Sequence, residues 1–466
     1  HLGMRRVGFG NTWGRGIRTK LCGSLVVVCT ALIVGTAPPS FAQDNVPAAA
    51  SNAAPNGEIS PTGEYKEGVA VGPWMLYPSL FVGGVYNSNF NQAATAANTD
   101  SGWSLRVAPR IIATSTDGAI HSTTLYGVGD FQFFNGNTAS ADAGWTQNYS
   151  PTQDVTLNFN LRYTRETSLF TSALNFNNNA IGPSGTPPVT IPIIVNPFGT
   201  SPSVNPIAYN QLTAGVSATK TFGEGFATVS ATAFDIIFDH GDSNPAPFNV
   251  SHDGASVWLS GKAGYHFVPG VYAYAEVTGV WQRYNASIFD TNGYRIIGGL
   301  GTDDKNSLFR GEIYGGYQYQ HQQQQGVPTF GIPQNSDSPV FGGRLSYYPT
   351  QYWTVIASVD EVLGIATIVA PTIPQGTPNL VTTALLQTTY GLSRQWSVGA
   401  RVGYTRSDYT GFNRLDTGWM AGGSFNYEIW RNLRLTLDYQ YSTSHSNLAF
   451  NSFNTNVYTA GLTYRY

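Results

Sequence analysis

The sequence predicts an all-β protein that crosses a membrane as an antiparallel up-and-down β-barrel of about 18 strands, with 16 strands as the alternative. Three observations predict this class. Apolar and polar residues alternate with the period of two that is typical of strands. Many alternating runs last 12 to 16 residues, whereas ordinary strands have about 5–6. Short turns alternate with long connections, as in outer-membrane barrels.

The composition fits this class and excludes several others. Charged residues make up only 11% of the 466 residues, while aromatic residues reach 13%. Disordered chains carry many charges and few aromatics, and helical bundles are rich in Ala, Glu, Lys and Leu. A helical membrane protein would need apolar runs of 18 or more residues, and the longest run here is Leu21 to Val34. A net charge of −3 also argues against a nucleic-acid partner.

Residues 1–42 are predicted to be a secretory signal peptide. Five basic residues precede the apolar run, and Ser40 and Ala42 form a small-x-small end, so we expect cleavage between Ala42 and Gln43. The alternative is a single membrane anchor, for which the run is short. Both cysteines lie in this segment, which excludes a disulfide framework beyond it. Without the segment, 19 Lys and Arg stand against 27 Asp and Glu, a net charge near −8.

Residues 43–71 are rich in Ala, Pro, Asn and Gly and have no apolar periodicity, so we expect a disordered periplasmic segment. The barrel is predicted to occupy 72–466. The alternation and the turns give strands, in chain order, at 75–87, 101–116, 119–134, 139–149, 153–167, 207–221, 225–238, 252–266, 270–284, 290–300, 306–319, 337–348, 352–366, 379–391, 396–409, 413–428, 431–445 and 454–466. The weakest are 139–149 and 290–300, and losing this pair would leave 16.

A soluble sandwich would show the same alternation, with its apolar face buried. The long runs favour the barrel, because a tilted strand needs about 9–11 residues to cross a bilayer. Aromatic residues also cluster at the ends of the runs, as expected for interfacial girdles. They include Trp353, Trp396, Tyr404, Trp419, Tyr427 and Tyr439.

The alternation also separates two sets of charged residues. The polar faces, predicted to line the lumen, carry nine basic residues (Arg106, Arg110, Arg162, Lys262, Arg310, Arg344, Arg401, Arg434, Arg465) and five acidic residues (Glu276, Glu312, Asp360, Glu428, Asp438). Nine further acids are expected at loops and turns on the outer side: Asp100, Asp142, Asp239, Asp242, Asp253, Asp290, Asp337, Asp408 and Asp416. Because rings of charge set ion selectivity, this wall predicts a modest preference for anions or neutral solutes. The alternative is that these residues pair across strands and brace the wall.

Several segments resemble the putative β-barrel porin 2 family of alphaproteobacterial outer-membrane proteins. They are Gly72-Pro73-Trp74-Met75-Leu76-Tyr77-Pro78-Ser79-Leu80, Tyr86-Asn87-Ser88-Asn89, Gly293-Tyr294-Arg295, Gly311 to Tyr317, Leu345 to Thr350 and Arg431 to Asn447. The resemblance runs from about Gly72 to Tyr466 and implies a pore-like barrel in the bacterial outer membrane. It implies no particular solute. Where the family pattern has Asp-Asp-Asn, this chain has Asn87-Ser88-Asn89.

The last strand ends on an aromatic residue, Tyr466, with Tyr458, Leu462 and Tyr464 on one face. Such an ending resembles the signal read by the bacterial barrel-assembly machinery. We therefore expect Sec export and barrel assembly as partners, with the lipid bilayer and lipopolysaccharide as surroundings; the oligomeric state stays open. The apolar segment 168–206 is expected either to fold into the lumen as a constriction or to pack on the barrel rim.

No enzyme, cofactor or metal site is predicted. The histidines are scattered, and no phosphate-loop or dinucleotide motif is present. The expected function is that of a porin-like protein for passive diffusion of small hydrophilic solutes. Two alternatives are a component of surface polysaccharide export and a structural or adhesive barrel with a plugged lumen.

Overall fold

The computed structural model describes the residues of a single β-barrel and its shorter connections. The described residues are 68–89, 100–117, 120–134, 138–168, 207–238, 253–285, 287, 290–302, 307–323, 335–350, 352–365, 378–393, 395–447 and 452–466. The predicted signal peptide with its cleavage site and the candidate constriction at 169–206 lie outside them.

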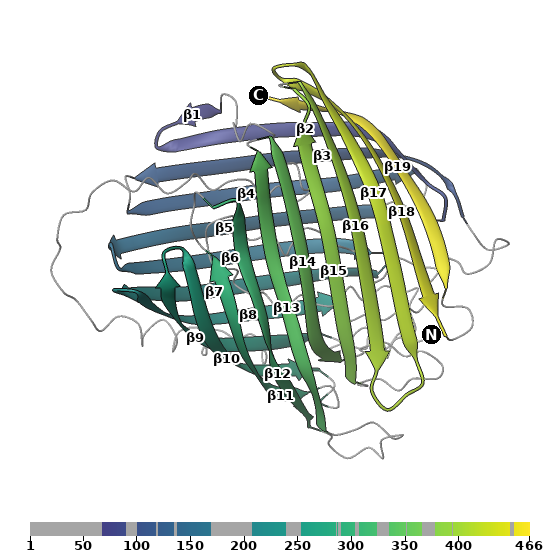
Figure 1. Cartoon of the computed structure of the whole chain (residues 1–466). Helices are drawn as coiled ribbons and strands as arrows, with labels where there is room; N and C mark the ends of the chain where they lie inside the picture. The colour runs from purple at the N-terminus through teal and green to yellow at the C-terminus, as the bar shows by residue number, and fades with distance from the viewer. Residues whose placement is uncertain are drawn as a thin grey trace, which may run out of the picture. The chain divides into compact units, whose positions relative to one another are not determined.

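Every regular element in the described residues is a strand (Figure 1). The strands are β1 Val69–Val71, β2 Trp74–Asn87, β3 Gly102–Asp117, β4 His121–Phe134, β5 Thr138–Thr152, β6 Val155–Ser168, β7 Ile207–Phe222, β8 Gly225–Phe238, β9 Gly254–Val268, β10 Val271–Tyr284, β11 Thr291–Thr302, β12 Phe309–Gln322, β13 Asn335–Thr350, β14 Trp353–Ile365, β15 Pro378–Gly391, β16 Trp396–Tyr409, β17 Leu415–Trp430, β18 Leu433–Ser446 and β19 Phe453–Arg465. The described part of the chain contains no helix that is long and apolar enough to span a bilayer.

Strands β2 to β19 form a closed barrel. Each pairs antiparallel with its neighbours in sequence, and β19 pairs with β2 from Val457↔Asn87 to Arg465↔Ser79. The barrel therefore has 18 strands: the first of the two predicted counts is confirmed, and the alternative of 16 is wrong. Glycine permits two of the tight turns, because Gly223 and Gly270 have φ values of +62° and +75°.

One short strand was missed. Val69–Val71 form β1, which pairs with Trp74 to Leu76 at the end of β2 that β19 does not reach. The expectation of disorder across 43–71 is therefore wrong for these three residues. Three residues are too few to show a period of two, which explains why the sequence pattern did not reveal them.

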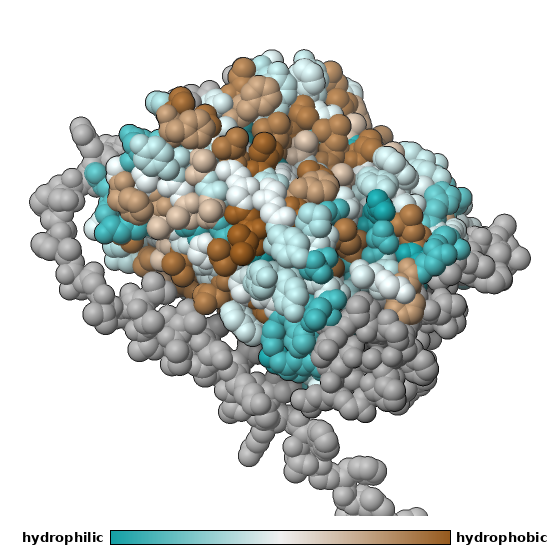
Figure 2. Space-filling view, turned by 60° about the horizontal axis from the view of Figure 1, so that its bottom comes forward, coloured by the Kyte–Doolittle hydropathy of each residue, from teal (hydrophilic) through white to brown (hydrophobic). Residues whose placement is uncertain are grey.

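The two faces of the wall differ in composition. Large hydrophobic side chains lie exposed on alternate residues of each strand, for example Val402 and Leu386 at 45% and 51% exposure. Figure 2 shows brown apolar side chains spread over the visible face of the barrel, with teal hydrophilic side chains mostly toward its margins. A contiguous apolar exterior on a closed sheet is the surface that lipid requires.

Aromatic side chains on this outer surface form two belts. At the end of the barrel with the short turns, Phe309 stacks on Tyr347 and Trp396 packs on Tyr427, with ring centroids 4.4 and 4.3 Å apart. At the other end, the contacts include Tyr404–Trp419, Tyr439–Tyr458 and Tyr86–Trp103.

The separation of the belts matches a bilayer. Trp396 and Tyr404 lie eight residues apart on β16, which is about 27 Å along a strand. A tilt of 35–45° reduces this to roughly 20 Å of height. On β12, Phe309 and Tyr319 are ten residues apart, which corresponds to roughly 26 Å of height at the same tilt. The apolar band of a membrane barrel is about 25 Å tall.

Candidate functional site: the charged inner wall

All the residues predicted to line the lumen lie on strands, with the parity opposite to that of the exposed hydrophobic residues. Lys262 and Glu276 are directly opposite each other on β9 and β10, and Arg344 is opposite Glu312 on β12 and β13. The inward-facing set is Arg106, Arg110, Arg162, Lys262, Glu276, Arg310, Glu312, Arg344, Asp360, Arg401, Glu428, Arg434, Asp438 and Arg465.

Tyrosine side chains join this wall across glycines. Tyr272 on β10 lies over Gly301 on β11, where any Cβ would overlap its ring. This bare position lets the phenol reach the next strand, so that Tyr272 OH donates a 2.5 Å hydrogen bond to Glu312 Oε1 on β12. Tyr274 lies over Gly299 in the same way.

The same Glu312 carboxylate also binds Lys262. Lys262 Nζ lies 2.6 Å from Glu312 Oε1, and the two side chains are only 9% and 11% exposed. The ammonium also lies 3.8 Å from the ring centroid of Tyr274, which is a close cation–π contact. Glu276 accepts a 3.2 Å bond from Thr278 Oγ1. Because buried charges are costly unless paired and hydrogen-bonded, this network stabilises charges that neighbouring side chains shield from water.

A second tyrosine bridge connects β11, β12 and β14. Tyr314 lies over Gly342 of β13 and donates its hydroxyl hydrogen bond to Asp360 on β14. Arg295 Nη2 lies 3.6 Å from the same carboxylate, with its guanidinium carbon 4.9 Å from the Tyr314 ring centroid. Arg295 is 5% exposed and the Asp360 side chain 17%, so a buried cation faces a half-buried anion, with β12 and β13 between their two strands.

The third group lies on β3 to β6. Arg106 binds Asp130 at 2.6 Å, and Arg162 binds Asp142. Tyr126 lies over Gly144 and donates a 3.2 Å bond to Asp142 Oδ1. The placement of Asp142 in an outer loop is therefore wrong: it lies on the inner face of β5. The run around it, with Ala, Gly and Ser on alternate positions, is too weakly apolar to show which residues face inward.

The fourth group lies on β16 to β19. Arg401 reaches over Gly422 of β17 to make two bonds to Asp438 on β18, at 2.9 and 2.8 Å. Arg434 binds Glu428 at 2.5 Å, and Arg465 lies 3.4 Å from the same carboxylate oxygen. Pairing across strands, the bracing alternative of the sequence analysis, thus describes most of the acidic side chains on the wall.

The net positive charge of the inner wall is smaller than the sequence pattern suggests. Asp130 and Asp142 add negative charge and Arg295 adds positive charge to the predicted set. Basic residues still outnumber acidic ones among the described inward-facing residues. Arg310 contributes to this excess, with its guanidinium 5.0 Å from the Tyr348 ring centroid; Arg110 lies opposite Ser79.

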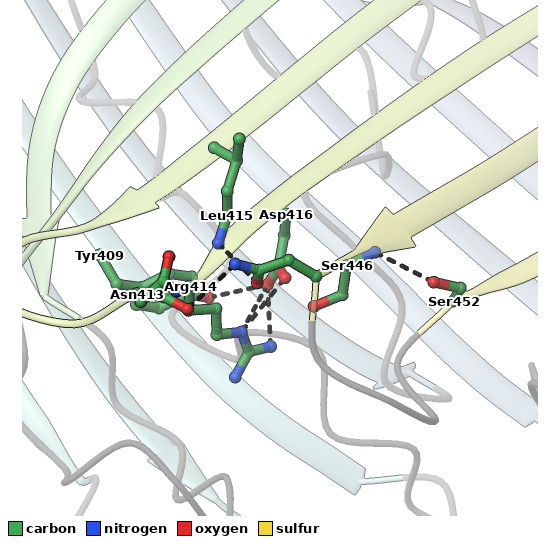
Figure 3. A network of polar contacts seen from close by, with 8 residues as sticks. Tyr409, Asn413, Arg414, Leu415, Asp416, Ser446 and Ser452 are labelled. Carbon is green, nitrogen blue, oxygen red and sulfur yellow. Dashed lines mark hydrogen bonds and ion pairs between the residues drawn. The ribbon is translucent and has the colours of Figure 1, made fainter.

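A separate buried ion pair lies at the end of the wall with the long connections (Figure 3). Arg414, in the connection between β16 and β17, lies 2.8 Å from Asp416, and the side chains are 3% and 7% exposed. The guanidinium also lies 4.8 Å from the Tyr409 ring centroid. Asn447 binds the neighbouring backbone at Leu415 N and Asn413 O, so this network joins β17 to the end of β18.

Sequence reasoning missed Arg295, Asp130 and the tyrosine bridges. Arg295 lies in 290–300, one of the two weakest predicted strands, and the sequence pattern singles it out only through the family resemblance. The tyrosine bridges depend on which glycine lies opposite which tyrosine on the next strand. That information is in the register and not in any single strand. Among the described residues, no group of three or more His, Cys, Asp and Glu side chains could hold a metal ion.

Comparison with known proteins adds a family. None of the curated proteins matches the chain. Two similar solved structures are OpdQ and OpdL from Pseudomonas aeruginosa, with TM-scores of 0.40, identities of 10% and 11%, coverage of 84% and 85% of this chain, and coverage of 98% and 99% of theirs. The siderophore receptor PirA from Pseudomonas aeruginosa has a TM-score of 0.39 and 9% identity over 84% of this chain and 80% of its own. The family model described as "putative beta-barrel porin 2" matches residues 64–466, and the chain belongs to this family.

Proposed function

We propose that the protein is an outer-membrane porin through which small hydrophilic solutes diffuse passively. The observation that carries this proposal is the sorting of side chains: a charged and polar inner wall and an apolar exterior with two aromatic belts. A wall of paired charges offers a solute polar contacts along its whole path. It attracts no ion strongly, because each paired charge is offset by its neighbour.

The small basic excess of the wall favours a weak preference for anions or neutral solutes. Charges that line a pore set its selectivity. Arg344 on β13 and Arg310 on β12 face the lumen, whereas Arg406 on β16 faces outward in an exposed pair with Asp408. These positions provide a matched comparison between an inner and an outer arginine.

The test is single-channel conductance and reversal potential of the refolded barrel in planar bilayers across a salt gradient. We expect open channels with a slightly anion-selective reversal potential. Arg344→Gln shifts this potential toward cations, and Arg406→Gln leaves it unchanged. A silent bilayer refutes diffusion through the lumen, and a clear cation preference refutes the charge argument.

A second candidate is a structural or adhesive barrel with a filled lumen. It is favoured by one observation: inward-facing Tyr272, Tyr274, Ile297 and Val340 form a buried apolar cluster, with Phe226 and Tyr314 packed against it. A wholly water-filled channel would leave such side chains wet. The same conductance measurement separates the two candidates, because a filled lumen does not conduct.

A further inference from the structure

The barrel wall splits between β13 and β14 at the end with the long connections. The two strands pair from Thr350↔Trp353 to Gly342↔Asp360, and the pairing stops there. Beyond that point, residues 335–341 of β13 pair only with β12, and residues 361–365 of β14, the β14 tip, pair only with β15. It is the longest such interruption in the described barrel: β5–β6 pairing stops at Ala141↔Arg165, three residues before either strand ends, and β3–β4 pairing skips Ala108 and Pro109.

The β14 tip lies on the lumen side of the wall. Gln318 and Gln320 of β12 point inward and are 1% and 4% exposed, and both bind the backbone of Leu363. Gln318 Nε2 donates to Leu363 O at 3.0 Å, Gln320 Nε2 donates to it at 2.9 Å, and Leu363 N donates to Gln318 Oε1 at 3.3 Å. We call Gln318 and Gln320 the glutamine clamp. One side-chain amide thus takes both bonds that a neighbouring strand would supply.

Proline explains why the strands separate here. Continuing the register beyond Gly342↔Asp360 would place Pro339 opposite Leu363. The N–H and C=O of Leu363 that bind the clamp point to the β13 side, so the residue at 339 would have to donate to Leu363 O. Proline has no N–H, so β13 could accept a bond from Leu363 N but donate none to Leu363 O; pairing in this register is weakened, and the clamp, which supplies both kinds of bond, is favoured over it. The Pro339 carbonyl, on the open edge, accepts a 2.9 Å bond from Ser338 Oγ instead.

The residue at which the split begins, Asp360, is held in place by neighbouring strands. Asp360, in the last β13–β14 pair, is held by Tyr314 of β12 and faces Arg295 of β11. The tip is anchored at its base and stays paired with β15, so it can pivot only together with the β15 residues beside it; on the β12 side only the two neutral amides of the clamp must be released. The open edge of β13 starts near the aromatic belt, where Tyr317 and Tyr319 lie opposite Pro339 and Asp337. Lipid tolerates an unpaired edge at the interface far better than at the bilayer centre.

We propose that the β14 tip is a gate: clamped by Gln318 and Gln320 it narrows the lumen, and released it rejoins β13, which widens the lumen and closes the split. The claim that the tip gates conduction rests on the proposed porin function. The claim that the tip has two positions does not rest on it and is tested without measuring conduction.

The position of the tip is measured by disulfide formation. Asp337→Cys/Ile365→Cys keeps Pro339 in place and brings two thiols together only when the register continues, because position 337 lies on the outer face of β13 while the β14 tip lies on the lumen side of the wall. The control pair, Leu345→Cys/Ala357→Cys, is already in register and cross-links in either state. The chain's own cysteines, Cys22 and Cys29, are replaced by serine.

The clamp is released by replacing both of its glutamines with leucine, which cannot form the hydrogen bonds. In the background Gln318→Leu/Gln320→Leu, we expect cross-linking of the 337/365 pair to rise by on the order of tenfold or more, because three hydrogen bonds are lost from the clamped state only. Gln322→Leu, the same change two residues further along the inner face of β12, leaves it unchanged. Gln320→Leu alone gives an intermediate rise.

Conductance then tests gating. Oxidised 337/365 barrels conduct more per channel than the same barrels after reduction, and the control pair shows no such difference. Heat-modifiable mobility on gels verifies that each variant is folded. Equal 337/365 cross-linking with and without the clamp overturns the two positions of the tip. Clamp-dependent cross-linking with unchanged conductance overturns gating, and cross-linking in a barrel that never conducts overturns only the porin function.

Discussion

Gly301 offers a quantitative test of the tyrosine bridges. Replacing it with alanine places a methyl group where the Tyr272 ring lies, so the ring must swing off β11. The swing breaks the 2.5 Å bond between Tyr272 OH and Glu312. A hydrogen bond to a charged group contributes about 1.5–3 kcal/mol, and Tyr272 is buried. We therefore expect Gly301→Ala to lower the free energy of unfolding by about 2 kcal/mol.

The same strand supplies the control. A Cβ at Gly298, on the outer face of β11, would meet its nearest atom, Tyr274 O, at an ordinary 3.7 Å. Gly298→Ala should be neutral or stabilise by about 0.4–1 kcal/mol, because alanine restricts the unfolded chain. Urea unfolding in detergent micelles, followed by tryptophan fluorescence, measures both variants.

A double-mutant cycle isolates the cause. In the background Tyr272→Ala the displaced ring is absent, so Gly301→Ala should cost almost nothing there. If Gly301→Ala is as harmless as Gly298→Ala, or keeps its full cost without the tyrosine, the bridge does not stabilise the wall in the manner described.

Two further predictions concern the outer face of the barrel and the buried ion pair. Val402→Arg, at an exposed outward position in the middle of β16, should destabilise the barrel in lipid vesicles by about 2–4 kcal/mol; a neutral result would mean that this face does not meet lipid. Asp416→Asn removes the carboxylate that pairs with the buried charge of Arg414 and should lower the free energy of unfolding by about 3–5 kcal/mol. Asp408→Asn, in a pair that is 49% exposed, should lower it by at most about 1 kcal/mol. Equal unfolding midpoints for these two variants would contradict the burial argument.

Periodicity predicted the long strands because each is a local pattern. In β18, for example, apolar residues such as Leu437 alternate with polar residues such as Asp438 whichever strands lie beside them, so one segment shows which face each residue occupies. The same reasoning failed for Asp142, where small residues on both faces of β5 leave little contrast. It also failed for Val69–Val71, which form a strand by pairing with β2 and carry no period of their own.

The contacts that organise the inner wall required information from several strands. Arg401 reaches Asp438 because Gly422 lies between them, and this neighbour is set by the register of three strands. One local signal could have revealed the split: Pro339 lies inside a run that otherwise alternates, and an interior proline indicates a strand edge.

The placement of the charged pairs explains how a closed barrel can contain a movable segment. Lys262–Glu312 connects β9 to β12, and Arg401–Asp438 connects β16 to β18, so the strands on both sides of β13 and β14 are cross-braced. Arg295–Asp360 reaches across the weak boundary itself, at the last residue of β14 that pairs with β13. Above this point only the uncharged amides of the clamp hold the β14 tip to β12, and their bonds are weaker than charge-assisted ones. Release of the clamp leaves these three ion pairs intact, so the tip can move with the end of β15 while the barrel stays closed below Asp360.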